Sequence, residues 1–105
     1  MKVAITSTGN STDAVLDSRF GRCSWFIIYD TELKSTEFIP NPNIDSIEGA
    51  GIASARLIAS KGAEKVISGE FGAKVKGVFD SLNIKLIVIK EENKTIKDII
   101  KLFQK

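Results

Sequence analysis

Five short stretches of hydrophobic residues predict β-strands. The first alternates toward Val3 and Ile5, and the second is apolar on both faces, which is typical of a strand inside a sheet. The sequence DTELK predicts a hairpin turn into the third stretch. That stretch ends where two prolines bracket Asn41, because proline cannot donate to a β-ladder. The predicted strands are residues 2–7, 24–30, 35–39, 65–69 and 84–89.

Three stretches with a helical period predict α-helices. The first covers residues 50–60 and ends at Lys61-Gly62, a sequence typical of a helix C-terminus. The last begins at Thr95, with Asp98 three residues later as a capping-box-like partner. In the helix between them, which follows the sequence GEFG, apolar residues fall at i, i+3, i+4 and i+7: Val75, Val78, Phe79 and Leu82.

The resulting order, βββαβαβα, restricts the topology. A helix between two strands requires a parallel, right-handed crossover, whereas the hairpin requires one strand to run antiparallel. We therefore predict a single α/β domain over residues 1–105: a five-stranded mixed sheet with one antiparallel strand and helices on both faces, as in ribonuclease-H-like folds. This topology places the ends of the strands at 2–7 and 65–69, with the glycine turns near them, along one edge.

Composition and charge exclude several classes of protein. The chain is 43% hydrophobic and 27% charged, as in ordinary globular domains. Its net charge of +2 provides no broad basic face for nucleic acid, although a few oriented amides and arginines suffice for a small anion. The opening apolar run is too short for a signal peptide or a membrane span. One cysteine excludes an intrachain disulfide, and we expect a cytoplasmic protein.

The chain contains no histidine, which excludes histidine-dependent triads and histidine metal sites within it. A transition-metal site would use Cys23, carboxylates, backbone groups, a partner or the cofactor's own ligands. The first strand carries no acidic residue, which argues against a two-metal nuclease, and no acid–base constellation is visible. We therefore expect that the protein is not an enzyme.

Four sequence segments together carry a resemblance that covers essentially the whole chain. They are MKVAITS, RFGRCSWF, NP followed by GAGIASARLIASKGAEKVISGEFG, and the closing amphipathic helix. In this order they resemble the dinitrogenase iron–molybdenum cofactor biosynthesis family: NifX-like proteins, the NafY core and the C-terminal domain of NifB proteins. Ser24 and Ala73 stand where members usually have proline, and the histidines common after Asn-Pro are absent.

The resemblance implies a ribonuclease-H-like sheet and the binding or carriage of iron–sulfur or iron–molybdenum cluster precursors, without catalysis. We therefore expect non-catalytic holding of such an anionic cluster, with a cofactor-assembly protein as a further partner and a monomer or weak homodimer as the oligomeric state. The alternative is a metal-free interaction or regulatory module of the same fold.

Cys23, Arg19 and Arg22 are candidate site residues around Gly21, whose missing side chain permits a turn that aims both arginines one way. A Cys23 thiolate at the surface would suit a metal or cluster, and the nearby arginines would lower the pKa of its thiol. The alternative is that Cys23 is a small buried residue at the start of the second strand. Guanidinium suits anionic clusters and phosphates. The alternative is that the arginines form ion pairs with Asp13, Asp17 or Glu48. We favour ion pairing for Arg19 and anion binding for Arg22.

Two pairs of glycines are the remaining candidates. Gly49 and Gly51 precede one helix, and Gly69 and Gly72 precede another, so that unpaired amides at each helix N-terminus offer an anion site. The alternative is that they only make tight strand-to-helix turns, which we favour for Gly69 and Gly72. The binding hypothesis requires both turns to face the Cys23 loop.

Overall fold

The computed structural model describes residues 1–46 and 48–104 and contains the predicted element order. The strands are β1 (Lys2–Ser7), β2 (Trp25–Asp30), β3 (Ser35–Pro40), β4 (Ala63–Ser68) and β5 (Lys85–Val88). The helices are α1 (Ala50–Ser60), α2 (Ala73–Ser81) and α3 (Ile96–Lys101). Ile47, which falls in the irregular segment expected before α1, lies outside the described residues.

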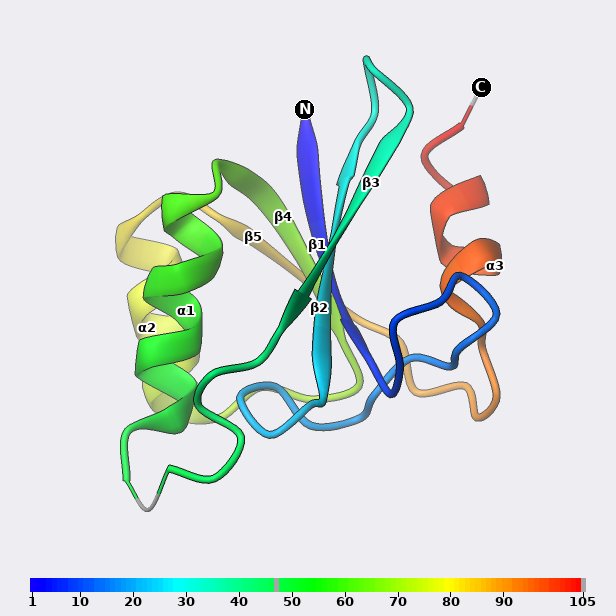
Figure 1. Cartoon of the computed structure of the whole chain (residues 1–105). Helices are drawn as coiled ribbons and strands as arrows, with labels where there is room; N and C mark the ends of the chain where they lie inside the picture. Colours follow the sequence, from blue (N-terminus) through cyan, green and yellow to red (C-terminus); the bar gives the residue numbers. More distant parts are fainter. Residues whose placement is uncertain (47, 105) are drawn as a thin grey trace.

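The strands form one sheet in the order β3-β2-β1-β4-β5. β1 pairs parallel with β4, β4 pairs parallel with β5, and β2 is antiparallel to both of its neighbours. The prediction of a five-stranded mixed sheet with one antiparallel strand is thus confirmed. The carboxyl ends of β1, β4 and β5 meet at one edge, at the bottom of Figure 1.

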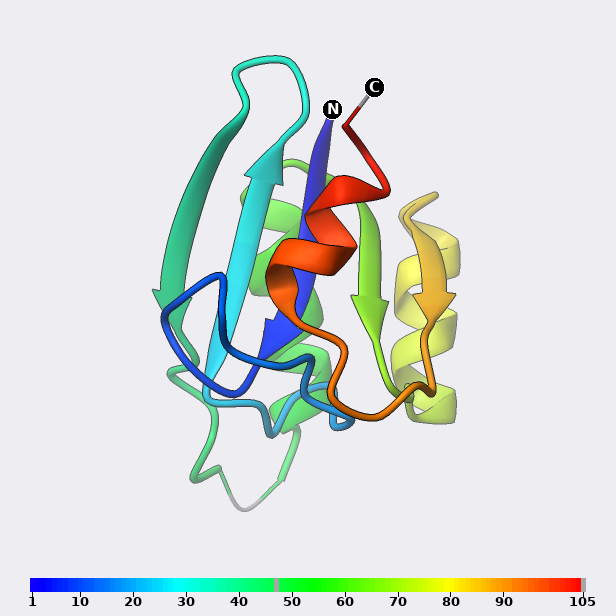
Figure 2. The same ribbon diagram turned by 90° about the vertical axis from the view of Figure 1, so that its right-hand side faces the viewer.

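The sheet separates two hydrophobic cores. On one face α1 and α2 pack over a cluster that includes Phe26, Ile58 and Phe79, each with an exposed fraction of 0%. On the other face α3 packs over Val3, Ile5 and neighbouring aliphatic residues. Figures 1 and 2 show the two long helices on one side of the sheet and α3 on the other. Because both faces are covered, β1 and β2 are apolar on both sides, as their sequences predicted.

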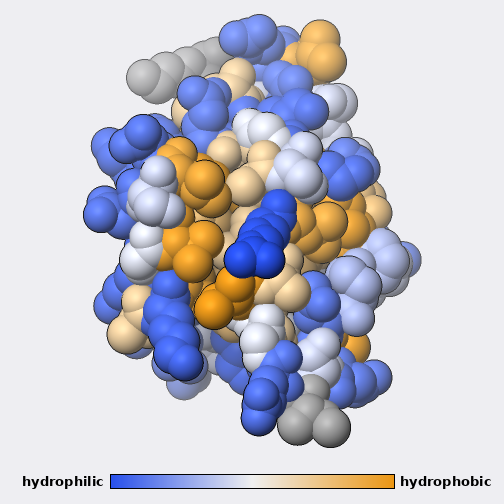
Figure 3. All heavy atoms as spheres, turned by 90° about the vertical axis from the view of Figure 1, so that its left-hand side faces the viewer, coloured by the Kyte–Doolittle hydropathy of each residue, from blue (hydrophilic) through white to orange (hydrophobic). Residues whose placement is uncertain are grey.

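The outer surface of α1 and α2 is itself partly apolar. Figure 3 shows hydrophobic residues gathered across the middle of this face, with a strongly hydrophilic side chain lying across them and hydrophilic residues around the rim. Leu57 and Val78 are half-buried here against the core below, and Leu82 is exposed. No helix among the described residues is long and apolar enough to cross a membrane.

Candidate functional site

The segment Asp17–Cys23, here called the 17–23 loop, lies at the edge where the parallel strands end. Its first residue is bound to β1: the Asp17 amide donates to the Thr6 carbonyl (3.0 Å), and the Thr6 hydroxyl donates to the Asp17 carbonyl (2.7 Å). The Gly69 amide donates to the same Asp17 carbonyl at 3.4 Å. The loop is therefore anchored both to β1 and to the turn after β4.

Phe20 anchors the middle of this loop in the core beneath it. Its ring centroid lies 5.7 Å from that of Phe26 and 5.4 Å from those of Phe71 and Phe79. Aromatic pairs at such separations contribute about 0.5–1.5 kcal/mol each beyond the burial of their area. The aromatic cluster thus holds the backbone between the two arginines against α2 and β2.

Gly21 and Asn41 fix the second half of the loop. Gly21 has φ +94°, and a Cβ at this position would lie 2.9 Å from the Cα of Gly51, so the loop backbone touches the start of α1 directly. The Asn41 side-chain amide, which is buried, donates to the carbonyls of Gly21 and Cys23, both at 2.9 Å. These contacts bring the loop, the α1 turn and the residues after β3 into one rigid corner.

A smaller hollow, with a volume of about 300 Å³, opens beside this corner. The described residues lining it include two cations, Arg22 and Lys74, and one carboxylate, Glu48. Gly49, Ala50 and Gly51 contribute the start of α1, and no described side chain caps that helix end. Three apolar side chains complete its wall: Phe20, Ile52 and Val75.

Arg22 is held at this hollow by backbone groups rather than by a carboxylate. Its Nη1 donates to the carbonyls of Ile44 (3.1 Å) and Ser46. None of the ion pairs among the described residues includes Arg22 or Glu48. The ion-pair alternative for Arg22 is therefore not seen among the described residues, and a role for Arg22 in binding an anion stays a prediction.

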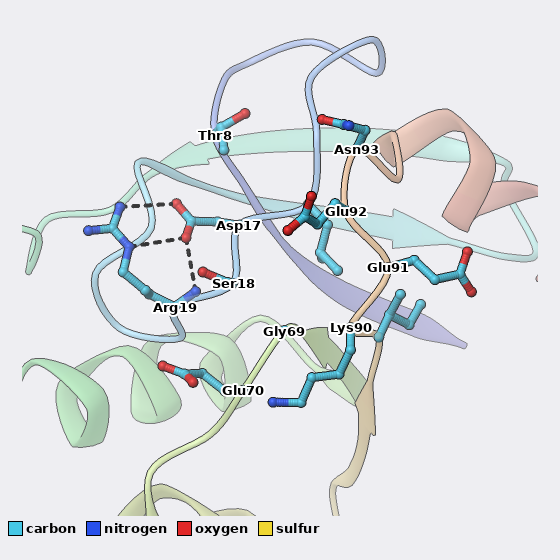
Figure 4. Close-up of a pocket in the computed structure, with 12 residues that line it drawn as sticks. Thr8, Asp17, Ser18, Arg19, Gly69, Glu70, Lys90, Glu91, Glu92 and Asn93 are labelled. Carbon is cyan, nitrogen blue, oxygen red and sulfur yellow. Dashed lines mark hydrogen bonds and ion pairs between the residues drawn. The ribbon is translucent and has the colours of Figure 1, made fainter.

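A larger hollow, of about 520 Å³, lies on the other side of the loop between the ends of β1, β4 and β5. Figure 4 shows Arg19 folded back onto Asp17 at one wall, with Glu70 and Lys90 beyond Gly69. The described lining carries two cations against four carboxylates, so its formal charge is negative: Arg19 and Lys90 against Asp17, Glu70, Glu91 and Glu92. The two hollows therefore differ in electrostatic sign.

Arg19 is committed to Asp17, as the ion-pair interpretation predicted. Its Nε lies 3.3 Å from Asp17 Oδ1, and its backbone amide donates to the same oxygen at 2.9 Å. The hydrogen bond to Asp17 and the negative charge of that carboxylate raise the pKa of Arg19. Asp13, another partner considered, pairs with Lys97 instead (3.2 Å).

The chain is similar to known proteins in both sequence and structure. A family model described as dinitrogenase iron-molybdenum cofactor matches residues 1–105. The chain belongs to this family. The orange protein from Desulfovibrio gigas, solved in its apo form, is similar over 97% of this chain and 85% of its own, with 28% identity and a TM-score of 0.89.

A Thermotoga protein described as a candidate NifB protein gives a TM-score of 0.78 and 30% identity, over 97% of this chain and 85% of its own. No curated protein sequence matched the chain. Membership connects the chain to the biosynthesis or binding of iron–molybdenum cofactor and to a family of carriers or binding proteins, and the resemblance inferred from its motifs is confirmed.

The structure corrects the prediction that Cys23 is exposed. The hypothesis of a surface thiolate with a lowered pKa is wrong, because Cys23 is fully buried in the core under α1 and α2. Burial, together with the negative charge of Asp17, raises the pKa of its thiol to about 12. Ligation of a metal by Cys23 remains a prediction, and it now requires the thiol to leave the core.

Of the four glycine candidates, Gly51 and Gly69 pack against the 17–23 loop, whereas a Cβ on Gly49 or Gly72 would meet nothing within 4 Å. Gly49 and Gly51 line the smaller hollow, and Gly69 lines the larger. A Cβ on Gly69 would lie 2.5 Å from Ser18 Cα, so its first role is close backbone packing. Gly72 lines neither hollow, has nothing within 4 Å of a built Cβ, and stands at the N-cap of α2. Both turns thus reach the loop, through Gly51 and Gly69.

Three residues at the site were not predicted as part of it. Lys74 lines the smaller hollow from α2, at a position typical of solvated surface, and Glu48, considered only as an ion-pair partner of the arginines, lines it from the residue before the α1 N-cap. Asn41 was noted only as the residue between two prolines. An amide side chain where a strand ends between prolines is the signal that would have predicted a bond from Asn41 to the backbone.

Proposed function

We propose that the protein holds and delivers a preassembled anionic metal–sulfur cluster, of the iron–sulfur or iron–molybdenum type, in the smaller hollow. The observation that carries this proposal is the charge of its lining. Arg22 and Lys74 line it together with the start of α1, where no described side chain caps the helix and where the amides and the helix dipole favour an anion, while the larger hollow is negative overall.

The donor set determines how such cargo would be held. Within residues 1–46 and 48–104, no three histidine, cysteine, aspartate or glutamate side chains are grouped so that they could hold a metal ion. Cys23 is buried and protonated at neutral pH. We infer that the cluster keeps its own sulfide ligands and is bound through charge, hydrogen bonds and apolar contact.

This mode of binding suits a carrier rather than a catalyst. A hollow of about 300 Å³ is at the small end of ligand sites, and a few charge-assisted hydrogen bonds are readily exchanged with those of an acceptor. A cofactor-assembly protein that supplies or receives the cluster is the partner this function requires. We expect the carrier to work as a monomer or weak homodimer in the cytoplasm.

The experiment is anaerobic reconstitution with iron, sulfide and molybdate, followed by desalting, metal analysis and visible absorption. The protein should retain metal and show sulfide-to-metal charge-transfer bands, and the double variant Arg22→Gln/Lys74→Gln should lose both. Arg19→Gln is the matched control, because it removes one arginine from the same loop but from the other hollow. Retention by the double variant would refute the assigned site.

Two further outcomes have definite meanings. If the unmodified protein retains no metal, the carrier function is wrong and a metal-free interaction module of the same fold replaces it. If Cys23→Ala alone abolishes retention while remaining folded, the cluster is held through the thiol and the charge-based mode is wrong.

A further inference from the structure

The outer edge of β3 presents backbone groups to which another strand can bind. β3 is the outer strand beside β2, and Figure 2 shows it along one side of the molecule. The Asn41 amide donates to the Ser24 carbonyl at 3.0 Å, so the odd-numbered residues of β3 bond to β2. The backbone groups of Thr36, Phe38 and Pro40 therefore point away from the sheet. Because proline has no amide, this edge offers two amides and three carbonyls.

The two edges of the sheet differ in how well they are protected against pairing. Natural edge strands are protected by short length, lysine side chains and proline. β5 has four residues and begins with Lys85, whereas β3 has six residues and proline only at its end. The one charged side chain of β3 is Glu37, whose Oε2 lies 3.2 Å from Lys61 Nζ. Phe38 adds an apolar side chain with an exposed fraction of 36%, so the β3 edge is the one open to a further strand.

We propose that β3 is a self-association surface, at which a second copy of this chain pairs antiparallel and continues the sheet. This inference does not depend on the proposed carrier function. A molecule with a single open edge forms a closed twofold dimer rather than a fibre, because each copy uses that edge on the other.

The charge and the backbone conformation of this segment select one register. Centred on Phe38, the pairing sets Phe38 against its copy and Thr36 of one copy against Pro40 of the other, which uses both outward amides of each strand. Centred on Glu37, it would place two carboxylates directly opposite, with about 4.5 Å between Cα atoms, where like charges are destabilising. Centred on Thr36, it would need an extended Lys34, which has a φ of +55°. The register is therefore the one centred on Phe38.

The size of this interface determines its strength. A strand of six residues is about 20 Å long, and one strand pair buries less than the roughly 1,200 Å² of the smallest standard interfaces. We therefore expect a dissociation constant on the order of 0.1–1 mM, so that the protein is largely a monomer at micromolar concentration.

The direct test is hydrogen exchange of individual amides in the unmodified protein, followed by NMR at about 50 µM and about 2 mM. At the higher concentration, exchange of the Thr36 and Phe38 amides should slow by about twofold to fourfold, because only the monomer exposes them. Unchanged exchange at both residues would overturn the proposal.

The outward amides of β5 are the matched control for this measurement. The Ile89 amide donates to the Ser68 carbonyl at 3.1 Å, so the amides of Leu86 and Val88 point away from β4. Their exchange should not depend on concentration. Slowing at Leu86 and Val88 in place of β3 would assign the contact to the other edge and overturn the proposal.

Substitutions then test the surface and the register by sedimentation velocity. Phe38→Lys should weaken association at least about tenfold, because it sets two lysines opposite each other. Val88→Lys, which makes the same kind of change at a side chain with an exposed fraction of 48% on β5, should leave it within about twofold. Glu37→Gln should also leave it within about twofold, and thermal melting shows that each variant is folded.

The contrary results are equally definite. If Phe38→Lys associates as strongly as the unmodified protein, the interface lies on another surface and the proposal is wrong. If Glu37→Gln strengthens association more than about tenfold, two carboxylates face each other in the dimer and the register centred on Phe38 is wrong.

Discussion

The buried thiol of Cys23 leads to a prediction about its reactivity. At pH 8, a thiol with the ordinary pKa of 9.0 is about one-tenth ionised, whereas a pKa of about 12 leaves roughly one molecule in ten thousand as thiolate. This lowers the reactive fraction about 1,000-fold. The greater nucleophilicity of a more basic thiolate offsets about 20-fold of that decrease, which leaves a factor of about 50.

Steric protection adds to this factor, because Cys23 has an exposed fraction of 0%. We therefore expect the native protein to react with an aromatic disulfide reagent at least about 100-fold more slowly than the chain unfolded in guanidinium. The assay is the absorbance of the released thiolate at pH 8. The variant Cys23→Ala/Asp45→Cys, which moves the single thiol to an exposed loop residue, should react at the unfolded rate in the native state.

A native rate within tenfold of the unfolded rate would refute this reasoning. It would show that Cys23 is reached without unfolding, and direct ligation of a metal by this residue would then become the better hypothesis. The reaction rate in the native state is thus also a test of the proposed mode of cluster binding.

The remaining predictions concern stability, measured by denaturant unfolding. Because its folded pKa is raised, Cys23 stabilises the fold below pH 9, and this contribution falls by about 1.4 kcal/mol per pH unit between pH 9 and 12; Cys23→Ala should remove that slope. Gly21→Ala should cost about 2–4 kcal/mol, because it combines a φ of +94° with a clash against the Gly51 backbone, and an unchanged midpoint would contradict this packing. Gly77→Ala, with open space around it in the interior of α2, should instead stabilise by about 0.5–1 kcal/mol. Asn41→Asp should cost about 3 kcal/mol or more, since a carboxylate would face two carbonyls; a loss below 1 kcal/mol would show that these bonds are weak.

Local sequence signals predicted most of the fold, for physical reasons that individual elements illustrate. The alternation in KVAITS correctly predicted the bounds of β1. The small and aliphatic residues before Lys61-Gly62 correctly predicted the bounds of α1. Thr95 is the N-cap of α3 and accepts a hydrogen bond from the Asp98 amide at 3.1 Å, as its spacing predicted. These elements depend on periodicity and capping, which are short-range properties.

Strand ends were predicted less accurately. β3 includes Pro40, because this residue pairs with Trp25 from an edge strand whose other side needs no amide donor. β4 begins at Ala63, two residues earlier than the apolar run in its sequence, since parallel pairing with β1 starts there. Both differences are set by the neighbouring strand, which the local sequence does not contain.

The site depended even more on long-range contacts. An ion pair for Arg19 was favoured from the sequence, with Asp17 as one of three partners considered. The burial of Cys23 instead follows from α1 packing over the loop, a contact between distant segments. The opposite signs of the two hollows could not be predicted, because each gathers residues from separate parts of the chain, such as Arg22 with Lys74. The sequence thus predicted the sheet edge at which the site lies. Which side chains share a hollow at that edge depends on contacts between distant segments.

The connection after β1 is held by hydrogen bonds to the segment that leads into α3. The Leu16 amide donates to the Lys94 carbonyl, the Ile96 amide to Ala14 and the Lys97 amide to Thr12, at 2.8–2.9 Å. These bonds tie down the residues that lead directly into the 17–23 loop. Unfolding of residues 94–97 would break all three bonds, so the order of the connection that enters the 17–23 loop depends on the packing of a segment more than 70 residues away in the sequence.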